Sequence, residues 1–97
     1  MPYAEPLTED QLTDALARLP EWSRDGVSLT RTVEVGGFTA AVRLVNQVAE
    51  AAEAANHHPD VCIHGYRKVT FTLSTHAAGA ITARDTELAE QIDRLAP

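Results

Sequence analysis

The sequence predicts an α+β fold in which helices cover one face of a four-stranded antiparallel sheet. Three observations support this prediction: two segments alternate apolar and polar residues, one long segment repeats apolar residues at helical spacing, and shorter amphipathic segments flank them. The predicted order is helix, strand, strand, helix, strand, strand, helix. Every apolar stripe is buried if the helices pack on one side of the sheet. The 97 residues fit a single domain spanning residues 1–97.

The two shorter helices are predicted from their N-terminal caps. Thr8 with Gln11, and Thr82 with Asp85, have the three-residue spacing of a capping box. Apolar residues follow each cap at helical spacing: Leu12, Ala15, Leu16 and Leu19 in the first helix, and Leu88, Ala89, Ile92, Leu95 and Ala96 in the last. Pro20 ends the first helix, because proline disfavours helical conformation in the preceding residue.

Strands are predicted on either side of a long central helix. In the first pair, Asp25-Gly26 is a turn dipeptide between the segment Trp22-Ser23-Arg24 and a strand from Val27 to Val35. Leu29, Val33 and Val35 of that strand face the core. Arg31 interrupts this apolar side, so we expect it not to be buried along its whole length. The second pair comprises a short strand and turn from Asp60 to Gly65, and a strand from Tyr66 to Thr75. In that last strand the apolar residues are Val69, Phe71 and Leu73, and His76 follows on the polar side.

The long helix is predicted from Phe38 to Asn56. Its apolar residues recur every three or four positions and should form the buried stripe: Phe38, Ala41, Val42, Val45, Val48, Ala49, Ala52 and Ala55. The helix should end before Pro59, which directly follows two histidines.

Composition excludes several functional classes. A net charge of −6 with scattered basic residues opposes binding to nucleic acid, and no apolar run approaches the length of about 20 residues that a membrane helix needs. The first residues lack the basic and apolar regions of a signal peptide. Cys62, the single cysteine, is expected to be a reduced, semi-buried thiol. We therefore expect a cytoplasmic protein without nucleic-acid or membrane partners.

Three histidines cluster at the ends of predicted elements. His57 and His58 follow the long helix, and His76 ends a strand. Histidine titrates near neutral pH and both accepts and donates protons, so such a group suits acid–base catalysis. Structural histidines are an equally common alternative before any further argument. His64, next to Gly65, is expected in an exposed turn outside this group.

Glu53 precedes His57 by four residues. If the helix continues to His57, both side chains share one face, and the carboxylate would fix the tautomer of the imidazole. The alternative is a solvated helix residue. Adjacent histidines chelate one ion poorly, and the sequence has no HExxH motif or cysteine pair, so we expect no metal and no other cofactor. Ser74 lies near His76 without an orienting acid, which argues against a hydrolase.

Two segments carry a resemblance to a known family: Glu53-Ala54-Ala55-Asn56-His57-His58-Pro59-Asp60, and Tyr66 to His76 with the continuation Gly79 to Asp85. Together they resemble the signature of the pterin-4a-carbinolamine dehydratases, and the similarity extends over most of the chain. The resemblance implies a lyase that dehydrates 4a-hydroxytetrahydrobiopterin to quinonoid dihydropterin, in tetrahydrobiopterin recycling, without a cofactor. It also implies a homodimer or homotetramer.

The resemblance assigns roles to individual residues. His57 and His76 match histidines of proton transfer, Glu53 matches their supporting carboxylate, and His58 and Pro59 match substrate-binding positions. Backbone groups of Thr75, His76 and Ala77 would meet the donor–acceptor edge of the pterin. Arg84 and Asp85 match a family pair, although a helix-capping role is sufficient for Asp85. Which histidine is the acid and which is the base stays open.

The sequence also departs from the family pattern. Val61 replaces a common aromatic residue, and Ala80 replaces a common glycine, which would cause strain if that position needed positive φ. The turn around His64 is one residue longer than in animal relatives. The alternative function is a non-catalytic protein-binding or assembly module on the same fold.

Overall fold

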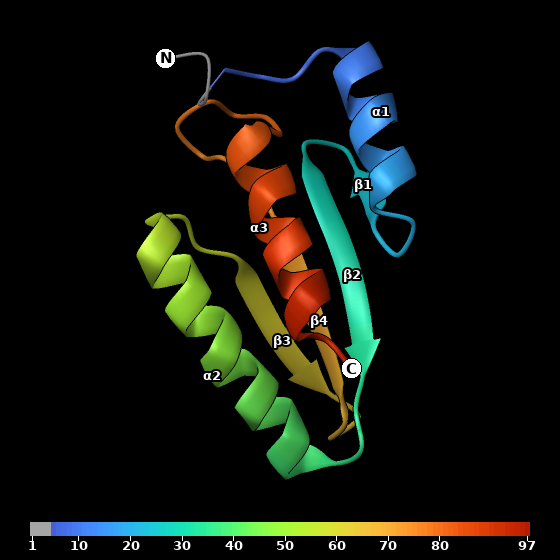
Figure 1. Cartoon of the computed structure of the whole chain (residues 1–97), viewed down its shortest axis with the longest axis vertical. Coiled ribbons are helices and arrows are strands. Elements are labelled where there is room, and N and C mark those ends of the chain that lie inside the picture. Colours follow the sequence, from blue (N-terminus) through green and yellow to red (C-terminus); the bar gives the residue numbers. More distant parts are fainter. Residues whose placement is uncertain (1–4) are drawn as a thin grey trace.

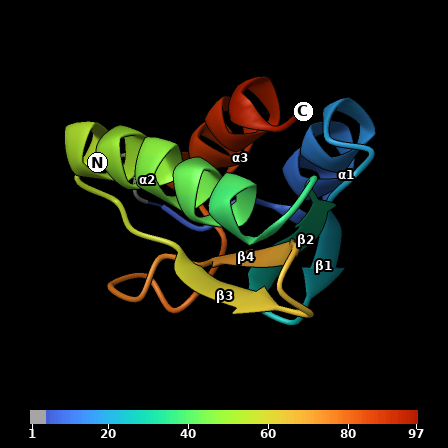
Figure 2. The same ribbon diagram turned by 90° about the horizontal axis from the view of Figure 1, so that it is seen from below.

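The structure is a computed structural model that describes residues 5–97. Its helices and strands follow the predicted order: α1 (Glu9–Arg18), β1 (Ser23–Asp25), β2 (Ser28–Glu34), α2 (Phe38–Ala55), β3 (Asp60–His64), β4 (Lys68–Leu73) and α3 (Ala83–Leu95). The strands form one antiparallel sheet in the order β1-β2-β4-β3. The helices lie on one side of this sheet, and its other side is open (Figures 1 and 2). The predicted fold class is confirmed.

The two faces of the sheet differ in polarity, as the alternating pattern predicts. Leu29, Val33, Val69, Phe71 and Leu73 point into the core beneath the helices and are almost completely buried. The open face carries hydroxyl side chains, including those of Thr32 and Thr70, whose Oγ1 atoms are 2.7 Å apart. His64 lies at the end of β3 and not in a turn, with Nε2 2.8 Å from the Thr70 hydroxyl. Cys62 is exposed, so the prediction of a semi-buried thiol is wrong.

The strand bounds are narrower than the alternating pattern suggests. Gly65 and Tyr66 both have positive φ, 56° and 53°, as a tight hairpin turn between β3 and β4 requires. Tyr66 therefore belongs to the turn and not to the strand. At the other end, Thr75 leaves the sheet and forms an isolated antiparallel bridge with Ala80.

Both capping boxes are present. In α1 the backbone N–H of Gln11 donates to the Thr8 hydroxyl, and the Gln11 side chain accepts from the backbone N–H of Thr8. In α3 the carboxylate of Asp85 accepts from the backbone N–H of Thr82. These reciprocal contacts satisfy N–H groups that a helix leaves unpaired at its start.

The buried stripe of α2 is displaced from the predicted one. Its buried residues are Ala41, Leu44, Val48 and Ala52. Phe38 and Val42 are instead 57% and 38% exposed. Two apolar stripes lie side by side on this helix, and periodicity alone does not distinguish the one that faces the sheet. No helix within residues 5–97 is long and apolar enough to cross a membrane.

Arg31 lies on the core-facing side of β2 and forms an ion pair with Asp93 of α3. Its Nη1 is 2.5 Å from Oδ1 of Asp93, which also accepts a 2.8 Å hydrogen bond from the Trp22 indole. The Arg31 side chain is only 14% exposed. The helix α3 therefore covers this part of β2, and its Asp93 carboxylate pairs with the Arg31 charge. The core-facing side of β2 is thus only partly buried at Arg31, as expected, and Asp93 pairs its charge there.

Candidate active site

The predicted site residues meet where the C-terminal end of α2 approaches the loop between β4 and α3. A depression of about 220 Å³ lies there, and its lining consists of Asn56, His57, His58, Ser74, Thr75, His76, Ala77 and Arg84. Six residues selected from the sequence, three of them histidines, thus surround one space. Proximity of several titratable rings in a depression is the arrangement that acid–base chemistry needs.

The two consecutive histidines owe their placement to the way in which α2 ends. Asn56 adopts the left-handed conformation (φ 50°, ψ 44°) and its N–H donates to Glu53 O and Ala52 O. The N–H of His57 also donates to Ala52 O, at 3.1 Å. This pattern is a Schellman motif, which turns the chain sharply away from the helix axis. His57 is therefore buried, whereas His58 is exposed.

His57 lies against a buried carboxylate. Its Nε2 is 2.5 Å from Oδ1 of Asp85, and Asp85 is completely buried. A carboxylate accepts hydrogen bonds, so Nε2 is the ring nitrogen that carries the donated proton. Nδ1 is left as the nitrogen for proton exchange at the depression. The carboxylate thus fixes both the tautomer and the orientation of the imidazole.

A chain of hydrogen bonds holds Asp85 itself. Its Oδ2 accepts from the Thr75 hydroxyl and from the backbone N–H of Thr82, both at 2.9 Å. The hydroxyls of Thr75 and Thr82 are 2.8 Å apart, and the Thr82 hydroxyl accepts from the backbone N–H of Arg84. The carboxylate only accepts, so Thr75 uses its one hydroxyl hydrogen to donate to Asp85. The Thr82 hydroxyl therefore donates to Thr75. Every buried polar group of this set has a partner.

The predicted pairing of Glu53 with His57 is wrong. Glu53 is hydrogen-bonded to Nε2 of His58, and both side chains are largely exposed. The reason is the left-handed turn at Asn56: the helix stops before His57, so the spacing of four residues no longer places the two side chains on one face. Asp85 occupies the supporting position that Glu53 was expected to fill, in addition to the capping role predicted for it.

Glu53 and Pro59 lie on the far side of His58. With His58 they line a separate apolar groove, which also includes Val45, Val48, Ala49, Ala52 and Val61. His58 is the residue that this groove and the depression share. Of the residues selected from the sequence, these two are therefore not part of the depression.

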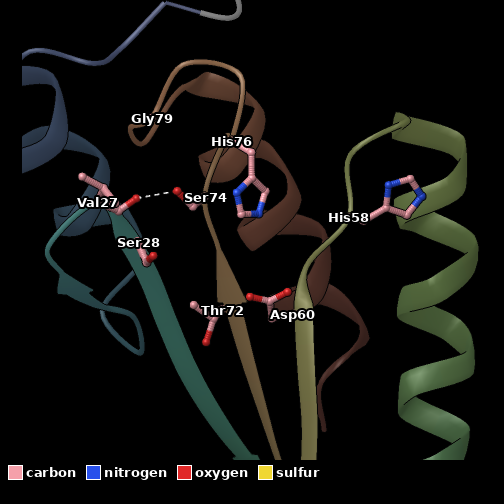
Figure 3. Close-up of a pocket in the computed structure, with 8 residues that line it drawn as sticks. All are labelled: Val27, Ser28, His58, Asp60, Thr72, Ser74, His76 and Gly79. Atoms are coloured by element: carbon pink, nitrogen blue, oxygen red, sulfur yellow. Dashed lines mark hydrogen bonds between the residues drawn. The ribbon is translucent and has the colours of Figure 1, made fainter.

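His76 lies on the open face of the sheet (Figure 3) and also lines the depression. It follows Ser74, whose hydroxyl donates to the carbonyl of Val27 at 2.8 Å and ties the end of β4 to β2. The loop then turns tightly, with Gly79 at φ 62°. Ala80 is not among the residues with positive φ, so its replacement of a glycine causes no backbone strain.

The donor–acceptor groups of this loop are partly used by the turn. The Thr75 carbonyl accepts from the N–H groups of Ala78, Gly79 and Ala80, and the His76 carbonyl accepts from Gly79. The Thr75 N–H donates to Ala80 O. The N–H groups of His76 and Ala77 have no backbone acceptor within residues 5–97, so they are the groups with which this loop can meet a ligand.

Within residues 5–97, no group of three or more His, Cys, Asp or Glu side chains is placed to hold a metal ion. The site residue that sequence reasoning undervalued is Asp85. Its contact with His57 spans 28 positions in the chain, and a capping position alone does not reveal such a partner. Thr82 and Asp85 are both completely buried, which the capping pattern by itself does not indicate.

Comparisons with known proteins identify relatives of this chain. Residues 5–95 match the family model described as pterin 4 alpha carbinolamine dehydratase. A relative from Nocardia farcinica, with the provisional name pterin-4-alpha-carbinolamine dehydratase, is 55% identical over 92 residues, which cover 95% of this chain and 96% of the relative. A relative from Mycobacteroides abscessus with the same provisional name is 51% identical over 87 residues, covering 90% of this chain and 92% of the relative.

Two solved structures are also similar. A crystal structure described as transcriptional coactivator/pterin dehydratase from Brucella melitensis matches with a TM-score of 0.90 and 29% identity, covering 96% of this chain and all of that one. A pterin dehydratase-like protein, identified as a RuBisCO assembly factor in the alpha-carboxysome, matches with a TM-score of 0.61 and 17% identity, over 76% of this chain and 84% of that one. The second likeness concerns the fold alone. By its family match and its relatives, this chain belongs to the pterin-4-alpha-carbinolamine dehydratase family.

Proposed function

We propose that this protein is a hydro-lyase that removes water from 4a-hydroxytetrahydrobiopterin and releases quinonoid dihydropterin. The observation that carries the proposal is the His57–Asp85 pair, buried beside a depression that His58 and His76 also line. A buried carboxylate that orients one ring, with a second ring near it, is suited to paired acid–base work and has no obvious use in a scaffold.

The chemistry requires two proton transfers. The 4a-hydroxyl leaves as water after receiving a proton from a general acid, and the N5 proton moves to a general base. His57 and His76 supply these two roles, and no step needs a metal or an organic cofactor. His58 and the N–H groups of His76 and Ala77 bind the pterin. In a cytoplasm that contains an aromatic amino acid hydroxylase, the reaction would recycle tetrahydrobiopterin.

A dehydratase assay with synthetic 4a-hydroxytetrahydropterin tests the proposal. The protein should accelerate dehydration well above the spontaneous rate, and His76→Ala should lower turnover by about a hundredfold or more. His64→Ala is the matched control, since His64 is an exposed histidine on the same sheet whose contact is with Thr70. A wild-type protein that leaves the spontaneous rate unchanged, but purifies with a stable protein partner, would instead favour a binding or assembly module.

We also propose that the protein forms a homodimer or homotetramer. Three large apolar side chains remain exposed beside α2 and β3: Phe38, Val42 and Val61. Within residues 5–97, β3 is an edge strand that pairs only with β4, so its outer backbone groups are available to another strand. Sedimentation velocity at several concentrations should show an oligomer that Val42→Glu dissociates. A monomer at every concentration would refute this part of the proposal.

A further inference from the structure

A second pocket of about 190 Å³ adjoins the depression on the open face of the sheet (Figure 3). Its lining is Val27, Ser28, His58, Asp60, Thr72, Ser74, His76 and Gly79. It shares His58, Ser74 and His76 with the depression, so the two spaces adjoin each other at these side chains. A flat ligand whose reacting atoms lie near the histidines can therefore reach this pocket with its far edge.

Asp60 is the only carboxylate in the lining of this pocket. It is the first residue of β3 and pairs with Thr72 of β4, which places its side chain on the open face beside that of Thr72. Within residues 5–97 its carboxylate has neither a hydrogen bond nor an ion pair. A second exposed carboxylate on this face, that of Glu34 in β2, is paired with Arg67 at 3.1 Å. Asp60 thus presents two unused acceptor oxygens to the pocket.

The loop between β4 and α3, next to this pocket, offers hydrogen-bond donors. The carbonyls of Thr75 and His76 already accept hydrogen bonds within the turn, whereas the N–H groups of His76 and Ala77 have no backbone acceptor in the described chain. These two N–H groups are donors, which suit the acceptor atoms of a pterin. The 2-amino group and N3–H of a pterin are two adjacent donors, and a carboxylate accepts such a pair with both oxygens.

We propose that Asp60 binds the 2-amino and N3–H edge of the pterin and selects 2-aminopterins over their 2-oxo counterparts, the lumazines. The inference rests on the proposed pterin substrate and adds the residue that recognises its pyrimidine ring. A 2-oxo group would place an oxygen against the carboxylate, where two acceptors repel each other. Asp60 is a binding residue, since it faces the ring edge and not the atoms that react.

Titration of the full chain with 7,8-dihydropterin and 7,8-dihydrolumazine, followed by ligand fluorescence, tests this inference. The wild type should bind the dihydropterin more tightly than the dihydrolumazine. Asp60→Asn should weaken dihydropterin binding by about tenfold or more and strengthen dihydrolumazine binding, because the asparagine amide donates to a 2-oxo group and still accepts from N3–H. Glu34→Gln removes the same charge from the same face and should leave both affinities unchanged.

An equal loss of affinity for both ligands in Asp60→Asn, or no change in either, would overturn the inference. So would a wild-type protein that binds neither ligand. The outcome is separable from that of the proposed function: dihydropterin binding with this selectivity but no dehydration would contradict the lyase alone. Normal dehydration by Asp60→Asn with unchanged KM and unchanged selectivity would contradict the Asp60 assignment alone.

Discussion

His57 donates through Nε2 to Oδ1 of Asp85 over 2.5 Å, and these two residues lie 28 positions apart in the chain. The contact joins the end of α2 to the first turn of α3. It gives the site a histidine whose orientation and tautomer do not depend on a bound ligand, and it leads to predictions that separate catalysis from stability.

His57→Ala and His76→Ala should differ in stability although both lower turnover. Each variant should lose about a hundredfold or more in kcat, as expected for lost acid–base catalysis. His57→Ala also leaves a buried oxygen of Asp85 without its donor, at a cost of about 1–3 kcal/mol in the free energy of unfolding. His76 is exposed, so its removal should cost less than about 0.5 kcal/mol. Urea unfolding beside the assay measures both quantities, and equal stability losses would contradict the burial difference.

Asp85→Asn should keep the shape of the buried hydrogen-bond network but place a donor where the network needs an acceptor. The amide nitrogen must face either His57, Thr75 or the N–H of Thr82, all of which donate to the carboxylate in the wild type. We expect kcat to fall by at least about tenfold, the usual scale for loss of an orienting partner. Thr86→Ala is a control on the same helix turn. Unchanged kcat in Asp85→Asn would show that His57 needs no orientation by this residue.

Glu53→Gln should have a small effect, in contrast to Asp85→Asn. The side chains of Glu53 and His58 are 76% and 57% exposed, and an ion pair of this kind contributes at most about 1 kcal/mol to stability. Since His58 is assigned to binding, we expect any kinetic effect in KM and an unchanged kcat. A fall in kcat comparable to that of Asp85→Asn would restore Glu53 to the supporting role expected from the sequence.

The ion pair between Glu9 and Arg24 predicts a pH effect on the stability of the fold. A hydrogen bond from Arg24, with Nη1 2.8 Å from Oε1, and the attraction of its charge hold the pKa of Glu9 below its ordinary value of 4.5. The pair therefore stabilises the fold above the pKa of Glu9 in the unfolded chain, and this contribution is lost as the pH falls through the lower folded pKa. NMR titration should show the midpoint of Glu9 below 4.5, returning towards it in Arg24→Gln; identical midpoints would refute the pairing.

The sequence predicted those features that depend on local patterns. Alternation in Val69, Phe71 and Leu73 identified the buried face of β4, and the spacing of Thr8 with Gln11 identified the start of α1. The bounds of β4 were less certain from the pattern, because Tyr66 lies in a hairpin turn that requires positive φ.

The prediction failed where the backbone conformation of a single residue determines the direction of the chain after it. The prediction for Glu53 assumed a helix through His57, but Asn56 is left-handed and reverses the direction of the next side chain. Asparagine tolerates this conformation, and Pro59 follows closely, so the signal was present in the residues. The partner of His57 could not be predicted in this way, since Asp85 reaches it only through the packing of α3 against α2.

The contacts of Asp85 also couple the mobility of three segments of the chain. One carboxylate holds the chain just after α2 through His57, the end of β4 through Thr75, and the first turn of α3 through Thr82. A ligand that restrains His57 therefore also restrains the beginning of α3 through this carboxylate. Amide hydrogen exchange at Asp85 and Thr86, whose N–H groups donate to Thr82 O, should slow when the depression is occupied. The start of this helix would then act as a built-in reporter of ligand occupancy.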